Sequence, residues 1–301
     1  MTPVDVVIER VRYTYRNWGR NTSVASMRED WDRLFEVPAL PGERDSVDID
    51  GVPGLWVVAP NAGSRNVVLY FHGGGFQLGS TRSHAELMGG ISGSAGCRVL
   101  GIDYRLAPEH RFPAALDDAR RAWAWLLAQG FPPSAVALAG DSAGGNLVLA
   151  LLLDLARNGA EMPACGVAMS AWTDLTASGE AYESRAQSDP IHQRPMIRAL
   201  AQNYLGDGGD PTSPLASPLF AEEADLAKLP PLLLQVGDRE TVLSDSTAFA
   251  EKARRAGAKV DLEVWDEMIH VFQQFPNELS EAREAVTTIG NFVRKHFNET
   301  N

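Results

Sequence analysis

The chain of 301 residues is long enough for one large α/β domain with a substantial core, or for two small domains. Its composition, with 45% hydrophobic and 22% charged residues, is that of an ordinary globular protein. The formal net charge of −12 disfavours nucleic acid and anionic membranes as partners, because a polyanion repels both.

The N-terminal segment carries charges and lacks the apolar region of a secretory signal. No uninterrupted apolar run approaches the roughly 18 residues of a membrane span. We therefore expect a soluble, cytoplasmic protein. Cys97 and Cys165 each lie in an apolar, strand-like run, so we expect them to be buried and not to form a disulfide.

The chain begins with two predicted helices. The first is predicted from apolar residues at helical spacing, which form one stripe on a surface helix. A second short helix is predicted over 23–36. The stripe of the first helix consists of Val4, Val7, Ile8, Val11 and Tyr15.

The rest of the chain mostly alternates between short β-branched runs and helical patterns. Strands that are apolar on both faces and alternate with helices predict a mostly parallel central sheet covered by helices on both faces, an α/β fold. The predicted strands cover 56–59, 66–71, 97–104, 135–140, 165–172, 230–237 and 259–265, and the predicted helices 112–130, 146–159, 244–257 and 277–297.

Two segments do not fit this alternation. One is the pair of opening helices, within about 1–45. The other is 173–218, where Ser, Thr, Pro and Gly residues surround one helix-like patch, "IRALAQNYL". We expect both segments to form a helical cap over one edge of the sheet, within a single domain that spans 1–301.

The string "GDSAGG" at 140–145 contains the candidate nucleophile, Ser142. A similar string occurs in chymotrypsin-like proteases, but those have no helix after it, and their histidine and aspartate precede the serine. Here a strand precedes the string, a strong helix follows it, and His270 comes after the last strand. The order Ser, acid, His and the Gly-x-Ser-x-Gly turn are those of α/β-hydrolases. We therefore expect a strained turn at Ser142, which Gly140 and Gly144 leave room for, and His270 as the base.

The string "HGGGF" at 72–76 follows a strand. Backbone N–H groups of a glycine run can converge on one small volume, which is what an oxyanion hole needs. A phosphate-binding loop is the rival interpretation, but no Lys-Ser/Thr follows the glycines.

These two strings, together with "DYRLAPEHRFPAALDD" at 103–118, resemble the bacterial hormone-sensitive-lipase family of esterases, from about residue 45 to the end. The resemblance implies an α/β-hydrolase fold and a carboxylic ester hydrolase that acts through an acyl-enzyme, with neither metal nor cofactor. It assigns the oxyanion donors to Gly74, Gly75 and Ala143 and makes His72 a structural residue. It also implies that Arg105, Pro108 and Glu109 hold the connection after a strand, with the two charges as a buried structural pair.

The acid of the triad has two candidates, Asp238 and Glu240, both directly after the strand "LLLQVG". Matching the helix "STAFAEKA" to the corresponding helix of the family without a gap puts Glu240 at the acid position. Asp238 is then a structural or capping residue. Either carboxylate can orient an imidazole.

Residues of the cap should line the substrate pocket, and the candidates are Trp18, Trp172, Met196 and Tyr204. The absence of a long apolar lid favours short-chain, soluble esters. The segments "QVGDRETVLSDS" and "QNYLGDGGDPTSP" also resemble monoterpene lactone hydrolases, so a lactone is the alternative substrate.

A more distant alternative is a non-catalytic receptor like the plant gibberellin receptors, which share this fold. Those receptors have lost the catalytic histidine, whereas His270 is present here. Family members commonly dimerise through the last strand and the adjoining helix, which implies a homodimer through 259–265 and 277–297.

Overall fold

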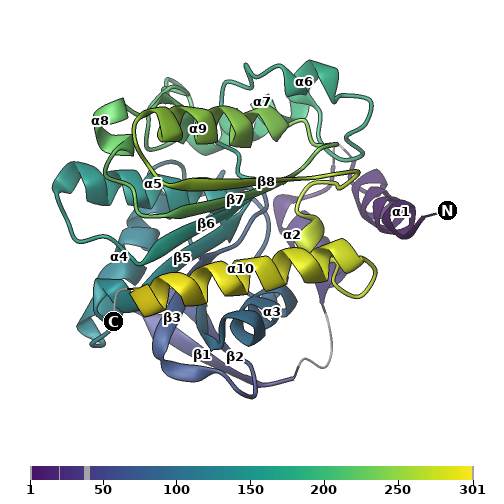
Figure 1. Ribbon diagram of the computed structural model, residues 1–301. Coiled ribbons are helices and arrows are strands. Elements are labelled where there is room, and N and C mark those ends of the chain that lie inside the picture. The colour runs from purple at the N-terminus through teal and green to yellow at the C-terminus, as the bar shows by residue number, and fades with distance from the viewer. Residues whose placement is uncertain (1, 20, 37–40, 300–301) are drawn as a thin grey trace.

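The computed structural model describes residues 2–19, 21–36 and 41–299. Within these residues the chain forms one eight-stranded sheet in the order β1-β2-β4-β3-β5-β6-β7-β8 (Figure 1). The β1–β2 and β2–β4 pairs are antiparallel and the others are parallel. The strands are β1 Glu43–Ile49, β2 Val52–Val58, β3 Gly63–Phe71, β4 Cys97–Ile102, β5 Val136–Asp141, β6 Cys165–Met169, β7 Leu232–Gly237 and β8 Val260–Trp265.

Helices cover both faces of this sheet, as expected from strands that are apolar on both sides. Helices α3 (Ala85–Ala95) and α10 (Ser280–Glu299) pack on one face, and they contact each other along their length (Figure 1). Helices α4 (Ala114–Ala128), α5 (Ala143–Asn158) and α9 (Leu243–Arg255), with the short α8 (Glu223–Leu226), cover the other face. The predicted α/β class and its layers are confirmed.

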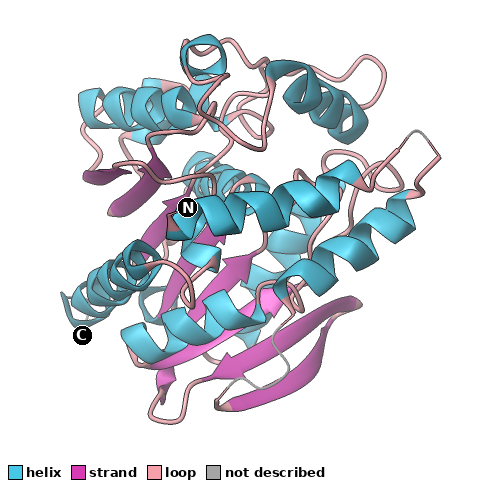
Figure 2. Cartoon of the chain, turned by 90° about the vertical axis from the view of Figure 1, so that its right-hand side faces the viewer, coloured by secondary structure: helices cyan, strands magenta, loops and turns pink. Residues whose placement is uncertain are grey.

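Four further helices lie beyond the carboxyl ends of the parallel strands, α1 and α2 on one side and α6 and α7 on the other (Figures 1 and 2). The apolar stripe of α1 is buried against Phe35 and against Phe272 and Phe275, which follow β8. These helices come from the two segments expected to form the cap. They are α1 Pro3–Arg16, α2 Val24–Phe35, α6 Ala181–Ser184 and α7 Arg194–Leu205.

Two elements differ from the sequence prediction for identifiable reasons. Strand β1 was not predicted, because most of its side chains are exposed and its sequence ERDSVDI is charged. It begins inside the segment expected to belong to the cap. Helix α3 was not predicted either, because it contains three glycines, each of which disfavours a helix by about 1 kcal/mol relative to alanine.

The ends of several predicted elements are also displaced. Strands β4 and β6 end at Ile102 and Met169, earlier than predicted, and α10 begins at Ser280, later than predicted. Helix α5 begins at Ala143, directly after Ser142 and three residues before its predicted start. The nucleophile candidate therefore lies at the helix N-terminus itself.

Both cysteines are buried, as expected, and neither forms a disulfide. Burial raises the pKa of the Cys97 thiol to about 12 and also raises that of Cys165, so both remain protonated. Among the described residues, the helices are all too short or too polar to cross a bilayer.

The expected pair between Arg105 and Glu109 is wrong. The Arg105 guanidinium instead binds Asp118 of α4, with Nη2 and Oδ1 2.9 Å apart, and the Asp118 side chain is fully buried. Glu109 is half-exposed and pairs with Arg28 of α2 at 2.7 Å. Both arginines face acids from other parts of the chain, so the expected local pair does not form.

Candidate active site

Ser142 occupies the sharp turn between β5 and α5. Its φ of 53° and ψ of −115° are strained for a residue with a side chain. The turn is held by neighbours, since the Ser142 N–H donates to the Met169 carbonyl at 2.8 Å. A Cβ on Gly144 would lie 1.9 Å from the carbonyl oxygen of Phe71, so this approach of helix and strand requires a glycine.

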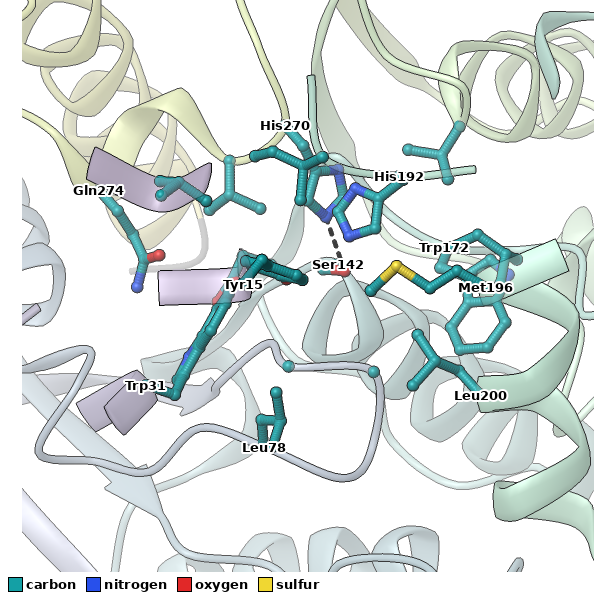
Figure 3. Close-up of a pocket in the computed structure, with 18 of the residues that line it drawn as sticks. Tyr15, Trp31, Leu78, Ser142, Trp172, His192, Met196, Leu200, His270 and Gln274 are labelled. Atoms are coloured by element: carbon teal, nitrogen blue, oxygen red, sulfur yellow. Dashed lines mark hydrogen bonds between the residues drawn. The ribbon is translucent and has the colours of Figure 1, made fainter. Parts of the chain in front are cut away.

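The structure brings the predicted serine, histidine and glutamate together from three separate loops. The Nε2 atom of His270 lies 2.9 Å from Ser142 Oγ, and Nδ1 lies 2.7 Å from Glu240 Oε2 (Figure 3). A carboxylate only accepts, so Nδ1 donates to it and Nε2 is left as the acceptor for the serine hydroxyl. This arrangement can take a proton from Ser142 and hold the imidazolium that results.

Glu240 is fully buried and its second oxygen is also bound. Oε1 accepts from the Ser170 hydroxyl at 2.7 Å and from the Gly237 N–H at 2.5 Å. The Ser170 hydroxyl also accepts from the N–H of Val271, at 3.1 Å. Ser170 therefore links the carboxylate to the residue that follows His270.

Two opposing effects act on the His270 imidazole. Burial by itself would lower its pKa, but the Glu240 carboxylate outweighs this, and the net shift raises the pKa above its ordinary value of 6.5. Asp238, the other candidate acid, does not contact the imidazole. Its Oδ1 accepts from the Glu267 N–H at 3.0 Å, which holds the turn after β8.

The glycine run after β3 faces the same volume as Ser142. Gly74 and Gly75 have φ values of 115° and 63°, line the pocket with Ser142, and direct their N–H groups to no acceptor among the described residues. The N–H of Ala143, at the first position of α5, is also without an acceptor there. Three backbone donors therefore remain free beside the serine.

Asp141, directly before Ser142, joins this glycine loop to the nucleophile turn. Its Oδ1 accepts from the Gly73 N–H at 3.0 Å and from the Tyr70 hydroxyl at 2.5 Å. Burial would raise the pKa of Asp141, but His84 and the hydrogen bond from Tyr70 outweigh it and lower the pKa below its ordinary value, so the carboxyl stays ionised. His72 is buried, stacks on Tyr104 with the ring centroids 4.3 Å apart, and does not line the pocket.

The pocket at Ser142 is enclosed by the cap (Figure 3). Of the four residues predicted to line it, Trp172 and Met196 do so and Trp18 and Tyr204 do not. Trp18 lies behind Tyr15, with ring centroids 4.7 Å apart, and donates to Asp30. Tyr204 is buried under the glycine loop, where its ring stacks on Phe76 at 3.7 Å.

Sequence reasoning missed several lining residues, including Tyr15, Trp31, Leu78 and Gln274. Tyr15 was assigned to the buried stripe of α1, with no role in a pocket. The signal for Gln274 was its position, four residues after His270 and therefore in the same loop. Trp31 carried no local signal, because α2 reaches the site only through tertiary packing.

His192 is a further lining residue and comes from the cap loop before α7. Its ring meets that of His270 edge to face, with centroids 4.3 Å apart, and its Nδ1 has no hydrogen-bond partner within the described part of the chain. Burial, reinforced by His270, lowers the pKa of His192 to about 3, so it is neutral. Asp189 fixes this loop, since it accepts from the N–H groups of His192 and Thr241, each at 2.8 Å.

Comparison with known proteins identifies the family of the chain. The sequence profile of the α/β-hydrolase fold family matches residues 68–274. An acetyl-hydrolase of Streptomyces hygroscopicus is 40% identical over 283 residues, 92% of each chain. An esterase of Acinetobacter venetianus is 37% identical, over 82% of this chain and 80% of its own.

A solved crystal structure also resembles this chain in both sequence and fold. The crystal structure of an esterase from the bacterial hormone-sensitive lipase family superposes with a TM-score of 0.92 at 42% identity, covering 98% of both chains. The match extends over the sheet and over both parts of the cap. The chain therefore belongs to the α/β-hydrolases and, within them, to the hormone-sensitive-lipase family of serine carboxylesterases.

Proposed function

We propose that this chain hydrolyses carboxylic esters through an acyl-enzyme on Ser142. His270 removes the proton of the hydroxyl and returns it to the leaving alcohol, and Glu240 orients the imidazole. The observation that carries this proposal is the continuous hydrogen-bonded chain from Ser142 through His270 to Glu240.

The oxyanion of the tetrahedral intermediate would be held by the N–H groups of Gly74, Gly75 and Ala143. All three lack an acceptor among the described residues, and each such donor is commonly worth a few kcal/mol in the transition state. Ala143 adds the positive end of the α5 dipole.

We propose short-chain esters as the preferred substrates. The enclosed pocket has a volume of about 60 Å³, whereas pockets for drug-sized ligands reach roughly 300 Å³ or more. Bulky side chains of α1, α2 and α7 close it on both sides of Ser142. Because residues on both sides of Ser142 line the pocket, an acyclic ester can place its acyl part on one side and its alcohol part on the other, whereas the single ring of a lactone cannot. The pocket therefore favours an acyclic ester.

The experiment is a series of p-nitrophenyl esters from acetate to laurate, with ε-caprolactone as the cyclic comparison. We expect kcat/KM to be highest at short chains, lower for the lactone, and lost in Ser142→Ala. A maximum at laurate would contradict the chain-length proposal. Failure of wild-type Ser142 to react with a fluorophosphonate probe would contradict catalysis and favour a receptor.

We also propose a homodimer through β8 and α10. Among the residues that the structure describes, β8 pairs only with β7 and no strand lies on its other edge, and Val264 of β8 is 48% exposed. An open strand edge readily pairs with a second chain. Light scattering after size exclusion measures this state directly.

A further inference from the structure

The two sides of the pocket differ in their hydrogen-bonding groups (Figure 3). We call the side formed by Trp172, Met196 and Leu200 the aliphatic side. The Trp172 indole N–H already donates to the Asp174 carbonyl at 3.1 Å, so this side presents apolar surface to a ligand. We call the opposite side, which includes Tyr15, Trp31 and Gln274, the aromatic side.

Two side chains of the aromatic side carry buried hydrogen-bonding nitrogens without a partner. They are the indole Nε1 of Trp31 and the carboxamide Nε2 of Gln274, and neither meets an acceptor among the described residues. Gln274 is only 8% exposed, and its carboxamide extends from the turn after His270 on the same side of Ser142 as Trp31 (Figure 3). Buried donors are nearly always paired, so unpaired donors on two residues that line a binding pocket indicate partners supplied by the ligand.

The surroundings of these donors restrict the kind of partner. Trp31 contacts the ring of Tyr15, at 5.9 Å between centroids, and that of Phe35, at 5.1 Å. Phe35 in turn contacts Phe275, at 5.6 Å. Arg10 lies over the ring of Phe275, 5.4 Å from its centroid, but its guanidinium is paired with Glu278. The unpaired nitrogens of Trp31 and Gln274 are neutral donors among aromatic rings, so they suit a neutral oxygen better than a charged group.

We propose that Trp31 and Gln274 form a subsite for a neutral oxygen acceptor of the substrate, such as an ether, ketone or hydroxyl oxygen a few bonds from the scissile ester. The aliphatic side then holds the purely alkyl part. The preferred substrates are therefore short esters in which one of the two parts carries this oxygen. This inference rests on the proposed ester hydrolysis at Ser142.

The test compares esters that differ only by replacement of one CH₂ by O. For the acyl part the pair is p-nitrophenyl pentanoate and p-nitrophenyl 3-methoxypropanoate, and for the alcohol part it is butyl acetate and 2-methoxyethyl acetate. For each pair the measured quantity is the ratio of kcat/KM for the ether to that for the alkyl ester. The electronic effect of the ether oxygen on the ester is the same for every variant, so a change in the ratio reports on the protein.

We expect Trp31→Phe and Gln274→Leu each to lower this ratio about fivefold, in one of the two pairs, because each removes one hydrogen bond. Trp18→Phe is the matched control, because it removes an indole N–H that already donates to Asp30 and does not line the pocket, and it should leave both ratios unchanged. Thermal melting shows whether each variant is folded, and the two variants test the subsite separately.

The inference is overturned if both variants keep the wild-type ratio in both pairs. This includes the case in which kcat/KM falls by the same factor for the ether and for the alkyl ester. If the wild-type protein hydrolyses none of the four esters, the proposed function itself fails. These outcomes are distinguishable, because the second requires no variant.

Discussion

The identity of the triad acid gives a sharp prediction for Glu240→Gln. The amide keeps the shape of the side chain but removes the charge that faces the imidazole, with Nδ1 and Oε2 2.7 Å apart. Two unit charges about 4 Å apart interact by about 4 kcal/mol at an effective dielectric constant near 20. Because each 1.36 kcal/mol is about a factor of ten in rate, we expect kcat/KM to fall about a thousandfold.

The pH profile of kcat/KM gives an independent measurement for the same variant. The reaction needs neutral His270, so activity rises with pH through the pKa of that imidazole. In the native protein Glu240 raises this pKa against the effect of burial. In Glu240→Gln the carboxylate charge is gone, so we expect the acidic limb of the profile to move to lower pH.

Asp238→Asn is the matched control. The Asp238 side chain holds the Glu267 N–H in a turn and does not contact His270, so we expect a change in kcat/KM of no more than about twofold. A larger loss in Asp238→Asn than in Glu240→Gln, or an acidic limb that stays in place in Glu240→Gln, would refute the assignment of Glu240.

Three further predictions concern the turn, the fold and the assembly. In Gly144→Ala the new Cβ would collide with the carbonyl oxygen of Phe71, and the resulting shift of the nucleophile should lower kcat/KM about a hundredfold. Unchanged circular dichroism would show that the fold persists, and near-normal activity would contradict the prediction. In Arg105→Met the fully buried Asp118 loses the guanidinium that binds it at 2.9 Å and keeps Arg121 at 3.8 Å and the backbone N–H of residue 105. Since Arg105 is itself partly exposed, we expect a loss of about 2 kcal/mol, seen as a Tm about 5 °C lower; an unchanged Tm would show that the pair is not stabilising. Val264→Lys places a charge on the open edge of β8 and should convert a dimer into a monomer in light scattering, whereas a wild-type monomer would contradict the proposed assembly.

The local patterns of the sequence were sufficient for most of the fold. Strands β3, β5 and β7 are apolar on both faces, and this is visible without any partner. The nucleophile turn was also predictable, because the glycines at 140 and 144 flank the serine in one short string, although the contacts that require them include the carbonyl of Phe71 on the neighbouring strand. Strand β1 was not predictable in this way, because an exposed, charged edge strand has no apolar period.

Contacts between distant segments were predicted less well. Arg105 was paired with Glu109 because the two are close in sequence, but Asp118 and Arg28 lie closer to them in space. Trp18 and Tyr204 are aromatic residues of the two segments expected to form the cap, yet neither lines the pocket at Ser142, and they pack against Tyr15 and Phe76. Aromatic composition alone does not show which side of a helix faces a cavity.

The sequence by itself therefore indicated the α/β alternation, the strained serine between strand and helix, and the glycine run beside it, since each shows as a pattern within one short stretch of chain. The family match favoured Glu240 over Asp238, and the tertiary structure places Glu240 against His270. Only the tertiary structure decided that Trp31 and Gln274 line one pocket. The physical reason is that these contacts depend on how the sheet orders its strands and on how two separate cap segments pack above them, and neither is encoded within a single stretch of chain.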